Sequence, residues 1–99
     1  MQQAEGFRKG SNTMNTTIRQ YHSVKAAYPE LLVIFRHGDL FEAYDDDASL
    51  IAAALDLPTT QRKAGKHSTM VCTLPMNSAE ARMSTLLKAG HKLVLVEPM

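Results

Sequence analysis

"LLVIFRHGDLFEAYDDDA", residues 31–48, is the stretch of sequence that decides the fold. Its first part, residues 31–37, is β-branched and aromatic and is at first apolar on both faces, which is typical of a strand covered on both sides. Gly38 and Asp39 follow, and a glycine at the first central position of a two-residue loop suits a type II′ turn. The sequence therefore predicts a tight β-hairpin over residues 31–44.

The alternation of side chains along a strand decides which residues of this hairpin lie together. Leu40 and Glu42 should point to one face of the sheet, and Phe41 and Ala43 to the other. A shift of the pairing by one residue would turn every core side chain of the hairpin outward. We expect Leu40 and Glu42 to project together into solvent at the hairpin tip.

The rest of the chain divides into elements by the spacing of its apolar residues and by residues that start or stop helices. The order is α-β-β-α-β-β-α-β, which predicts an α/β fold of the mixed α+β kind, with about three helices flanking a mixed sheet. Residues 1–13 are polar and are expected to form a loose tail, and residues 14–99 a single domain. The expected helices are 16–27, 46–56 and one that runs from a cap at Asn77 to about Ala89, and the further strands are 59–63, 69–74 and 92–97.

Polar residues at two helix starts are expected to satisfy free backbone amides. Asp45 and Asp46 lie at the start of the second helix, where negative charge complements the helix dipole. Asn77 and Glu80 fit a capping box at the start of the third helix. The expected buried stripe of the second helix consists of Leu50, Ile51, Ala54, Leu55 and Leu57.

The composition is that of a soluble globular protein, with 44% apolar and 21% charged residues. No apolar run is long enough to cross a membrane, and the first residues lack the apolar core of a signal peptide, so the cytoplasm is the expected location. Cys72, the single cysteine, is expected to be a buried, inert thiol. The net charge is only +1, and the broad basic field of an independent nucleic-acid-binding protein is missing.

The acidic residues around the hairpin allow two interpretations. The carboxylates from Asp39 to Asp47, together with His37, offer ligands that suit Mg²⁺ or a transition metal, as in a metal-dependent nuclease. Against this, successive residues at a helix start point in different directions, so helix capping and solvation explain the run of aspartates without a ligand. We favour the second interpretation and expect neither a metal site nor catalysis.

No cofactor motif is present either. The four histidines include no pair at ligand spacing on one element. No serine lies in a nucleophile elbow, and no glycine-rich loop is present to bind a phosphate group. We therefore expect no cofactor.

A basic cluster lies on the turn between the two expected strands that follow the second helix. Arg62, Lys63, Lys66 and His67 all fall on or beside this turn. Such residues are suited to grip a phosphate backbone, and equally to keep a sheet edge soluble. The residues themselves leave both interpretations open.

A long motif runs from the first helix through the hairpin. It resembles the N-terminal mismatch-recognition domain of the MutS family, whose members carry Lys-x-x-x-Pro-(Glu/Asp), an apolar strand, and Arg-x-Gly-Asp-Phe-(Tyr/Phe)-Glu-x-(Phe/Tyr)-x-x-Asp-Ala. "ALDLPTTQRKAG" and "LPMNSAEARMSTLLKAGHKLVLVEPM" continue the likeness more loosely, so that it covers residues 15–97. The residues that fit the motif without a gap are Lys25, Pro29, Glu30, Arg36, Gly38, Asp39, Phe41, Glu42, Tyr44, Asp47 and Ala48.

The resemblance implies a double-stranded DNA partner. In the family, the Phe of a Phe-x-Glu motif stacks on a mispaired base in the minor groove, and the Glu hydrogen-bonds to that base. Here the stacking Phe falls on Leu40, which has no π face, and the acid is kept as Glu42. Phe41 does not take over the stacking role of the family's Phe, because Phe41 points to the other face of the sheet. The expected DNA contacts are Leu40 and Glu42, on the hairpin turned by Gly38 and Asp39, together with Arg62, Lys63 and Lys66 of the basic cluster.

Two functions follow from the resemblance and from its departures. The first is a stand-alone MutS-like domain that binds mismatched or distorted duplex DNA weakly, without an ATPase of its own. The second is a protein-interaction module that kept the fold and lost mismatch recognition, with other MutS-like or DNA-processing proteins as partners. We favour the first, because Glu42 is retained.

Overall fold

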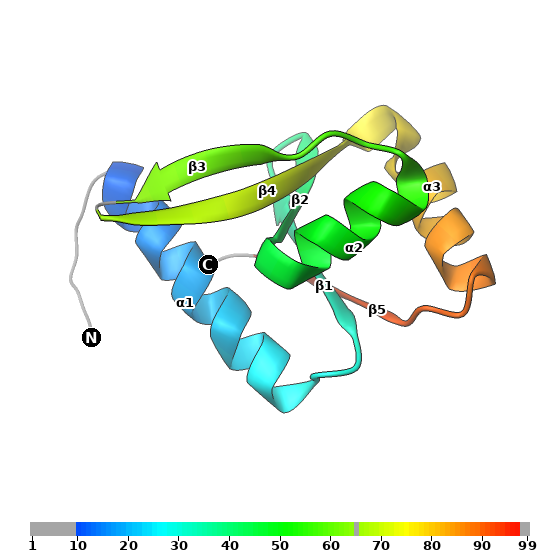
Figure 1. Ribbon diagram of the computed structural model, residues 1–99, viewed down its shortest axis with the longest axis horizontal. Coiled ribbons are helices and arrows are strands. Elements are labelled where there is room, and N and C mark those ends of the chain that lie inside the picture. Colours follow the sequence, from blue (N-terminus) through cyan, green and yellow to red (C-terminus); the bar gives the residue numbers. More distant parts are fainter. Residues whose placement is uncertain (1–9, 65, 98–99) are drawn as a thin grey trace.

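The computed structural model describes residues 10–64 and 66–97, with side chains for 16–63 and 66–97, and it confirms the predicted order of elements (Figure 1). Within this described part, no helix is both long and apolar enough to span a membrane. The elements are α1 (Gly10–Ala27), β1 (Leu32–His37), β2 (Leu40–Tyr44), α2 (Asp45–Leu55), β3 (Thr60–Ala64), β4 (His67–Pro75), α3 (Met76–Lys88) and β5 (Leu93–Val96).

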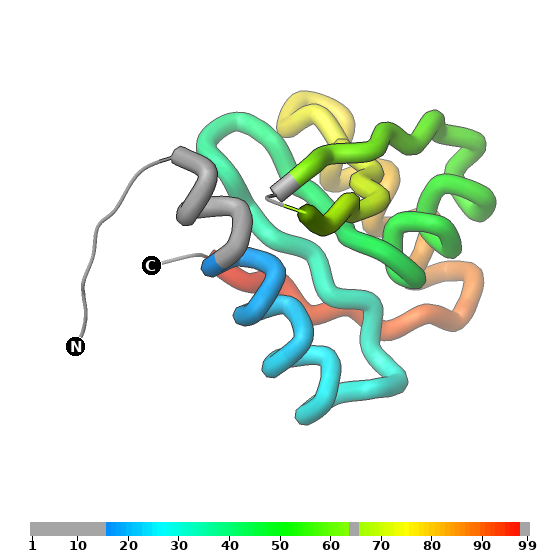
Figure 2. Tube along the Cα trace, turned by 60° about the vertical axis from the view of Figure 1, so that its left-hand side comes forward, coloured from blue at the N-terminus to red at the C-terminus, as the bar shows by residue number. Residues whose placement is uncertain are grey.

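The five strands form one mixed sheet in the order β3-β4-β2-β1-β5. β1 and β5 run parallel, and every other neighbouring pair is antiparallel. α1 packs on one face of the sheet, and α2 and α3 pack on the other (Figures 1 and 2). The fold is therefore mixed α/β, and β1 is an interior strand covered on both sides, as its apolar sequence predicts.

The predicted hairpin is confirmed. His37 pairs with Leu40, so Gly38 and Asp39 alone form the turn. Gly38 has a φ of 58°, whereas Asp39 is not among the residues with positive φ, which is the sign pattern of a type II′ turn. A Cβ added at Gly38 would meet nothing within 4 Å, so the backbone angle rather than crowding favours glycine here.

The predicted alternation of hairpin side chains is also confirmed, because the two faces of β2 contribute to separate cores. Phe41 and Ala43 pack in the core beneath α2 and α3. Tyr44 packs with Phe35 in the core beneath α1. Since residues two apart on a strand share a face, Glu42 lies on the α1 side with Tyr44.

The first helix is longer than predicted. α1 begins at Gly10 rather than at residue 16, so residues 10–13 of the expected tail are helical. Residues 1–9 of that tail lie outside the described residues. α1 contacts β3 as well as β1.

The predicted capping box at the start of α3 is wrong. The N-cap residue is Pro75, and no side chain caps the helix. β4 runs through Pro75 directly into α3, and the amide of Met76 donates a hydrogen bond to the carbonyl of Asp39 at 3.1 Å. The backbone of the hairpin turn thus takes the place of a cap, and Asn77 and Glu80 are exposed.

The predicted buried stripe of α2 is partly wrong. Ile51 is buried as expected, but Leu50 is 39% exposed. Ala48 and Ala52 lie inside instead, and their small side chains suit a close approach of the helix to the sheet. Asp47 is only 3% exposed, so the expectation that the whole aspartate run is a solvated helix start is wrong as well.

Candidate nucleic-acid interface

Leu40 lies at the tip of the β1–β2 hairpin, directly after the turn. It is 38% exposed, whereas the next four residues of β2 are buried. Its strand neighbours are His37 on one side and Pro75 on the other. The hydrogen bond from Met76 to Asp39 also ties the turn to the start of α3. Leu40 is therefore an exposed apolar side chain on a well-supported turn, as expected.

Glu42, by contrast, does not project into solvent, and the expectation that it lies open beside Leu40 is wrong. Its exposure is only 4%. Nη1 and Nη2 of Arg62 donate hydrogen bonds to its two carboxylate oxygens at 3.0 and 2.9 Å, and the Tyr44 hydroxyl donates a third at 3.0 Å. The cause is the guanidinium of Arg62, which reaches Glu42 from β3 and forms a bidentate ion pair with it.

This Glu42 cluster, which consists of Glu42, Arg62, Tyr44 and His37, holds an ionised acid. Burial alone would raise the pKa of Glu42, but the hydrogen bonds from Arg62 and Tyr44 outweigh burial and lower the pKa from its ordinary value of 4.5. The hydrogen bond to Glu42 raises the pKa of Arg62, and burial raises the pKa of the Tyr44 hydroxyl. His37 Nε2 lies 3.1 Å from the Tyr44 hydroxyl oxygen and 4.0 Å from Glu42 Oε1.

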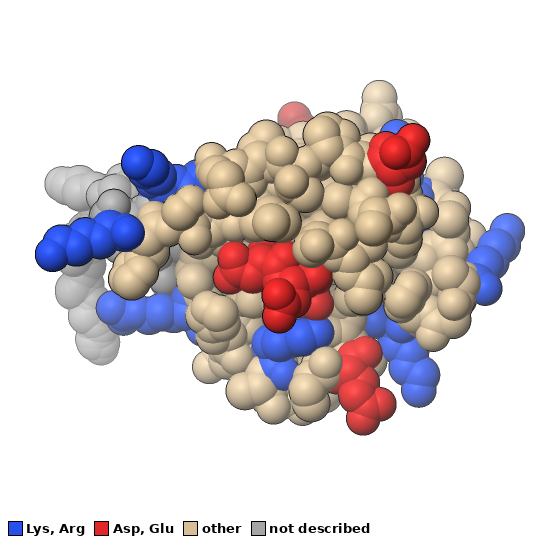
Figure 3. All heavy atoms as spheres, in the orientation of Figure 1, with Lys and Arg blue, Asp and Glu red and all other residues tan. Residues whose placement is uncertain are grey.

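The two predicted lysine contacts lie away from the Leu40 tip. Lys63 and Lys66 are exposed near the end of the β3–β4 hairpin, on the left in Figure 1, where Figure 3 shows basic side chains projecting. Along β4, Leu40 pairs with Pro75, and the hairpin ends at His67, eight residues away. At about 3.3 Å per residue, this is about 26 Å of strand. The structure therefore brings Arg62 to Glu42 but places the lysines at the other end of β4.

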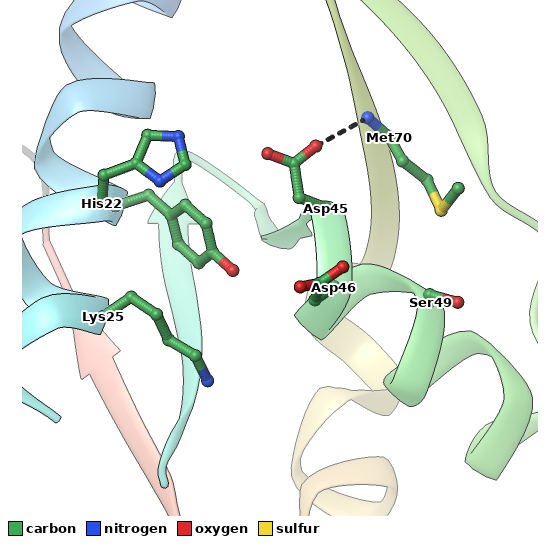
Figure 4. A pocket seen from close by; sticks show the side chains of 7 residues that line it. His22, Lys25, Asp45, Asp46, Ser49 and Met70 are labelled. Atoms are coloured by element: carbon green, nitrogen blue, oxygen red, sulfur yellow. Dashed lines mark hydrogen bonds between the residues drawn. The ribbon is translucent and has the colours of Figure 1, made fainter. Parts of the chain in front are cut away.

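A pocket of about 530 Å³, which the sequence did not predict, lies between α1, the start of α2 and β4 (Figure 4). Asp45 and Asp46 line it from α2, and acidic side chains gather near the centre of the face shown in Figure 3. Asp45 has a positive φ of 50° and accepts a hydrogen bond from the amide of Met70 at 3.3 Å. Nowhere in the described part of the chain do three His, Cys, Asp or Glu side chains gather in a way that could hold a metal ion.

Asp47 is the acidic residue whose role was missed. Its Oδ1 lies 2.9 Å from Lys25 Nζ, and its Oδ2 accepts a hydrogen bond from the amide of Val33 at 3.0 Å. Lys25 also donates to the carbonyl of Leu31 at 2.7 Å. A signal was present in the sequence, because Asp47 lies four residues before Ile51 and so on the same helical face. This carboxylate joins α1, α2 and β1.

Comparison with known sequences identifies the family. Residues 15–99 match the model of MutS domain I. The chain is 35% identical over 98 residues to the DNA mismatch repair protein MutS of Cereibacter sphaeroides, which covers 96% of this chain and 11% of that protein. It is 32% identical over 92 residues to the protein of the same name from Persephonella marina, covering 92% of this chain and 11% of the relative.

A third relative, the DNA mismatch repair protein MutS of Treponema pallidum, is 36% identical over 80 residues, with coverage of 81% of this chain and 8% of the relative. The chain thus spans about a tenth of the length of the curated relatives that it matches. The small α/β domain described above belongs to the MutS domain I family.

Proposed function

We propose that this domain binds double-stranded DNA and that the tip of the β1–β2 hairpin enters the minor groove. The observation that carries the proposal is the exposure of Leu40 on a fixed turn, at the position where the family resemblance expects a DNA contact. Apolar side chains act as wedges between base steps in many minor-groove proteins. In this role Leu40 unstacks a step without the base stacking that an aromatic ring supplies.

The phosphate contacts in this proposal come from Arg62, Lys63 and Lys66. The distance of about 26 Å between the Leu40 tip and the end of the β3–β4 hairpin corresponds to about eight base-pair steps of 3.4 Å. A duplex that lies along β4 therefore meets the wedge near one end of this footprint and the lysines near the other. Because these three cations make few phosphate contacts, binding is weak and sensitive to salt.

A wedge favours duplexes that are easy to distort. Unpaired or mispaired bases cost less to unstack than matched ones, so Leu40 gives a modest preference for mismatched or flexible DNA. This is a binding role rather than a catalytic one. It makes the domain a DNA-contacting part of mismatch repair, the process named in its relatives.

The test is fluorescence anisotropy with a labelled matched duplex and the same duplex carrying one mismatch, each at two salt concentrations. Wild type should bind both duplexes, more weakly at high salt, and Leu40→Ala should weaken binding of the mismatched duplex most. Leu95→Ala is the matched control, because Leu95 is a leucine with 53% exposure on the edge strand β5. If the anisotropy of neither duplex changes when wild type is added, the domain does not bind DNA and the proposal is wrong.

A protein-interaction role is the second candidate. It is favoured by the Glu42 cluster, in which the acid is already paired with Arg62, and by the absence of a ring at Leu40. In this case the exposed Leu40 tip contacts another protein. Flat DNA titrations together with a folded domain would favour this second role.

A further inference from the structure

Both carboxylate oxygens of Glu42 already accept hydrogen bonds inside the free domain. The carboxylate accepts hydrogen bonds from both terminal nitrogens of Arg62 and from the Tyr44 hydroxyl. At 4% exposure it offers no open acceptor to a molecule that approaches the hairpin tip. Any contact between Glu42 and a ligand therefore requires that the pair with Arg62 open first.

Arg62 is the accessible partner of this pair. Its side chain is 40% exposed, compared with 6% for the side chain of Glu42. A guanidinium binds phosphate with the same bidentate geometry that it uses for a carboxylate. An approaching phosphate thus meets Arg62 before any group of the ligand reaches Glu42.

We propose that Arg62 covers Glu42 in the free domain and is displaced from it by a bound phosphate. We call this arrangement the latch. A backbone phosphate of a bound duplex binds the guanidinium of Arg62, and the Arg62 side chain turns outward. The Glu42 carboxylate is then released toward the minor groove of the duplex, beside Leu40. This inference rests on the proposed function, because the duplex supplies the phosphate. Glu42 then becomes a specificity-determining residue only after Arg62 has bound the backbone.

The environment of Glu42 explains why it moves when Arg62 leaves. Burial opposes ionisation of this carboxyl more strongly than any other single influence, and Arg62 supplies the main opposing hydrogen bond and charge. After release, the Tyr44 hydroxyl and the imidazole of His37 are the polar contacts of the acid that remain among the described residues. A buried carboxylate that has lost its cation is strongly destabilised, so the carboxylate shifts toward solvent.

A competing arrangement has Arg62 bridging the two anions. A guanidinium carries five N–H donors, and Glu42 uses only the two nitrogens named above. In a bridge, the phosphate takes the remaining donors, and Glu42 stays buried and paired. The titration of the Glu42 carboxyl in the complex distinguishes the two arrangements.

The experiment is a pH titration of the Glu42 carboxyl carbon by NMR, for the free domain and for the domain saturated with matched duplex. In free wild type the pKa of Glu42 lies below its ordinary value of 4.5. A saturating duplex should raise this pKa toward the value found in free Arg62→Gln. Lys92→Gln removes the same charge from an exposed lysine just before β5 and should behave as wild type.

An affinity measurement adds an independent readout. Glu42→Gln keeps the size of the side chain and removes the charge that holds Arg62, so it should strengthen binding of a matched duplex by about tenfold, the effect of freeing one charged hydrogen-bond partner. Weaker binding by Glu42→Gln would overturn the latch.

Failure of the latch and failure of DNA binding are distinguishable. If duplex saturates the domain and the Glu42 titration is unchanged, Arg62 bridges and the latch is wrong, while DNA binding stands. If no duplex binds, the proposed function is wrong, and a titration with inorganic phosphate decides the latch alone. A Glu42 resonance that then moves in wild type but not in Arg62→Gln supports a latch for free anions, and a resonance that does not move overturns it.

Discussion

The side chain of Asp47 binds the backbone of Val33: its Oδ2 accepts a hydrogen bond from the Val33 amide at 3.0 Å. This contact ties the first turn of α2 to the start of an interior strand. The other carboxylate oxygen pairs with Lys25 of α1. One buried acid thus fixes three elements, including the strand that leads into the hairpin.

Asp47→Ala should destabilise the domain by about 3 kcal/mol, because it leaves the Val33 amide and the Lys25 ammonium without their buried partner. Asp46→Ala, one residue earlier and exposed, should cost less than about 1 kcal/mol, the scale of its interaction with the helix dipole. Urea unfolding followed by circular dichroism measures both. Equal losses for the two variants would contradict the role assigned to Asp47.

The free energy of unfolding should decrease below pH 4.5, in part because of Glu42. The pKa of Glu42 in the folded domain is lower than its ordinary value of 4.5. Its contribution to stability is therefore present above that value and is lost as the pH falls through the folded pKa. Glu42→Gln should show a shallower decrease over this range, whereas Glu80→Gln, on the exposed side of α3, should follow wild type in urea unfolding at a series of pH values.

Leu40→Phe should increase the preference for a mismatched duplex over a matched one by about fivefold or more. A ring at this position stacks on an unpaired base, and base–aromatic stacking contributes about 1–3 kcal/mol. The ratio of the two dissociation constants, measured by anisotropy at one salt concentration, checks this. A ratio equal to that of wild type would show that residue 40 does not face the bases.

The double change Lys63→Gln/Lys66→Gln should weaken binding of matched and mismatched duplexes equally. Each lost phosphate contact reduces the slope of log K against log salt by about 0.9, so the slope should fall by about 1 to 2. Lys88→Gln/Lys92→Gln changes the net charge by the same amount near the end of α3 and the start of β5 and should leave the slope almost unchanged. A similar decrease of this slope in both double variants would indicate a general effect of net charge.

The sequence predicted the order of elements and the hairpin faces, because both depend on local rules. Gly38 suited a type II′ turn, and the period of two then placed Leu40 and Phe41 on opposite faces, as found. The burial of Glu42 was not predictable in this way. Alternation assigns a face to a side chain, but the partner that covers it, Arg62, lies 20 residues away in the sequence.

The errors at helix ends have a related cause. The start of α3 has a capping-box sequence, yet β4 leads directly into the helix. The amide of Met76 therefore donates its hydrogen bond to the carbonyl of Asp39 and not to a capping side chain. That contact joins residues distant in the sequence, so local signals did not predict it. For Asp47 a local signal was present, because its position relative to Ile51 places it on the buried face of α2. Its charge nevertheless predicted an exposed side chain.

The parallel pairing of β5 with β1 has a consequence for folding. Leu32 pairs with Leu93, 61 residues later, whereas β1 and β2 are joined by only a two-residue turn. Contacts of such long range form slowly, because a long loop must close first. During synthesis the hairpin can therefore assemble early, while the other side of β1, with four buried apolar residues, stays unpaired until Val96 has left the ribosome.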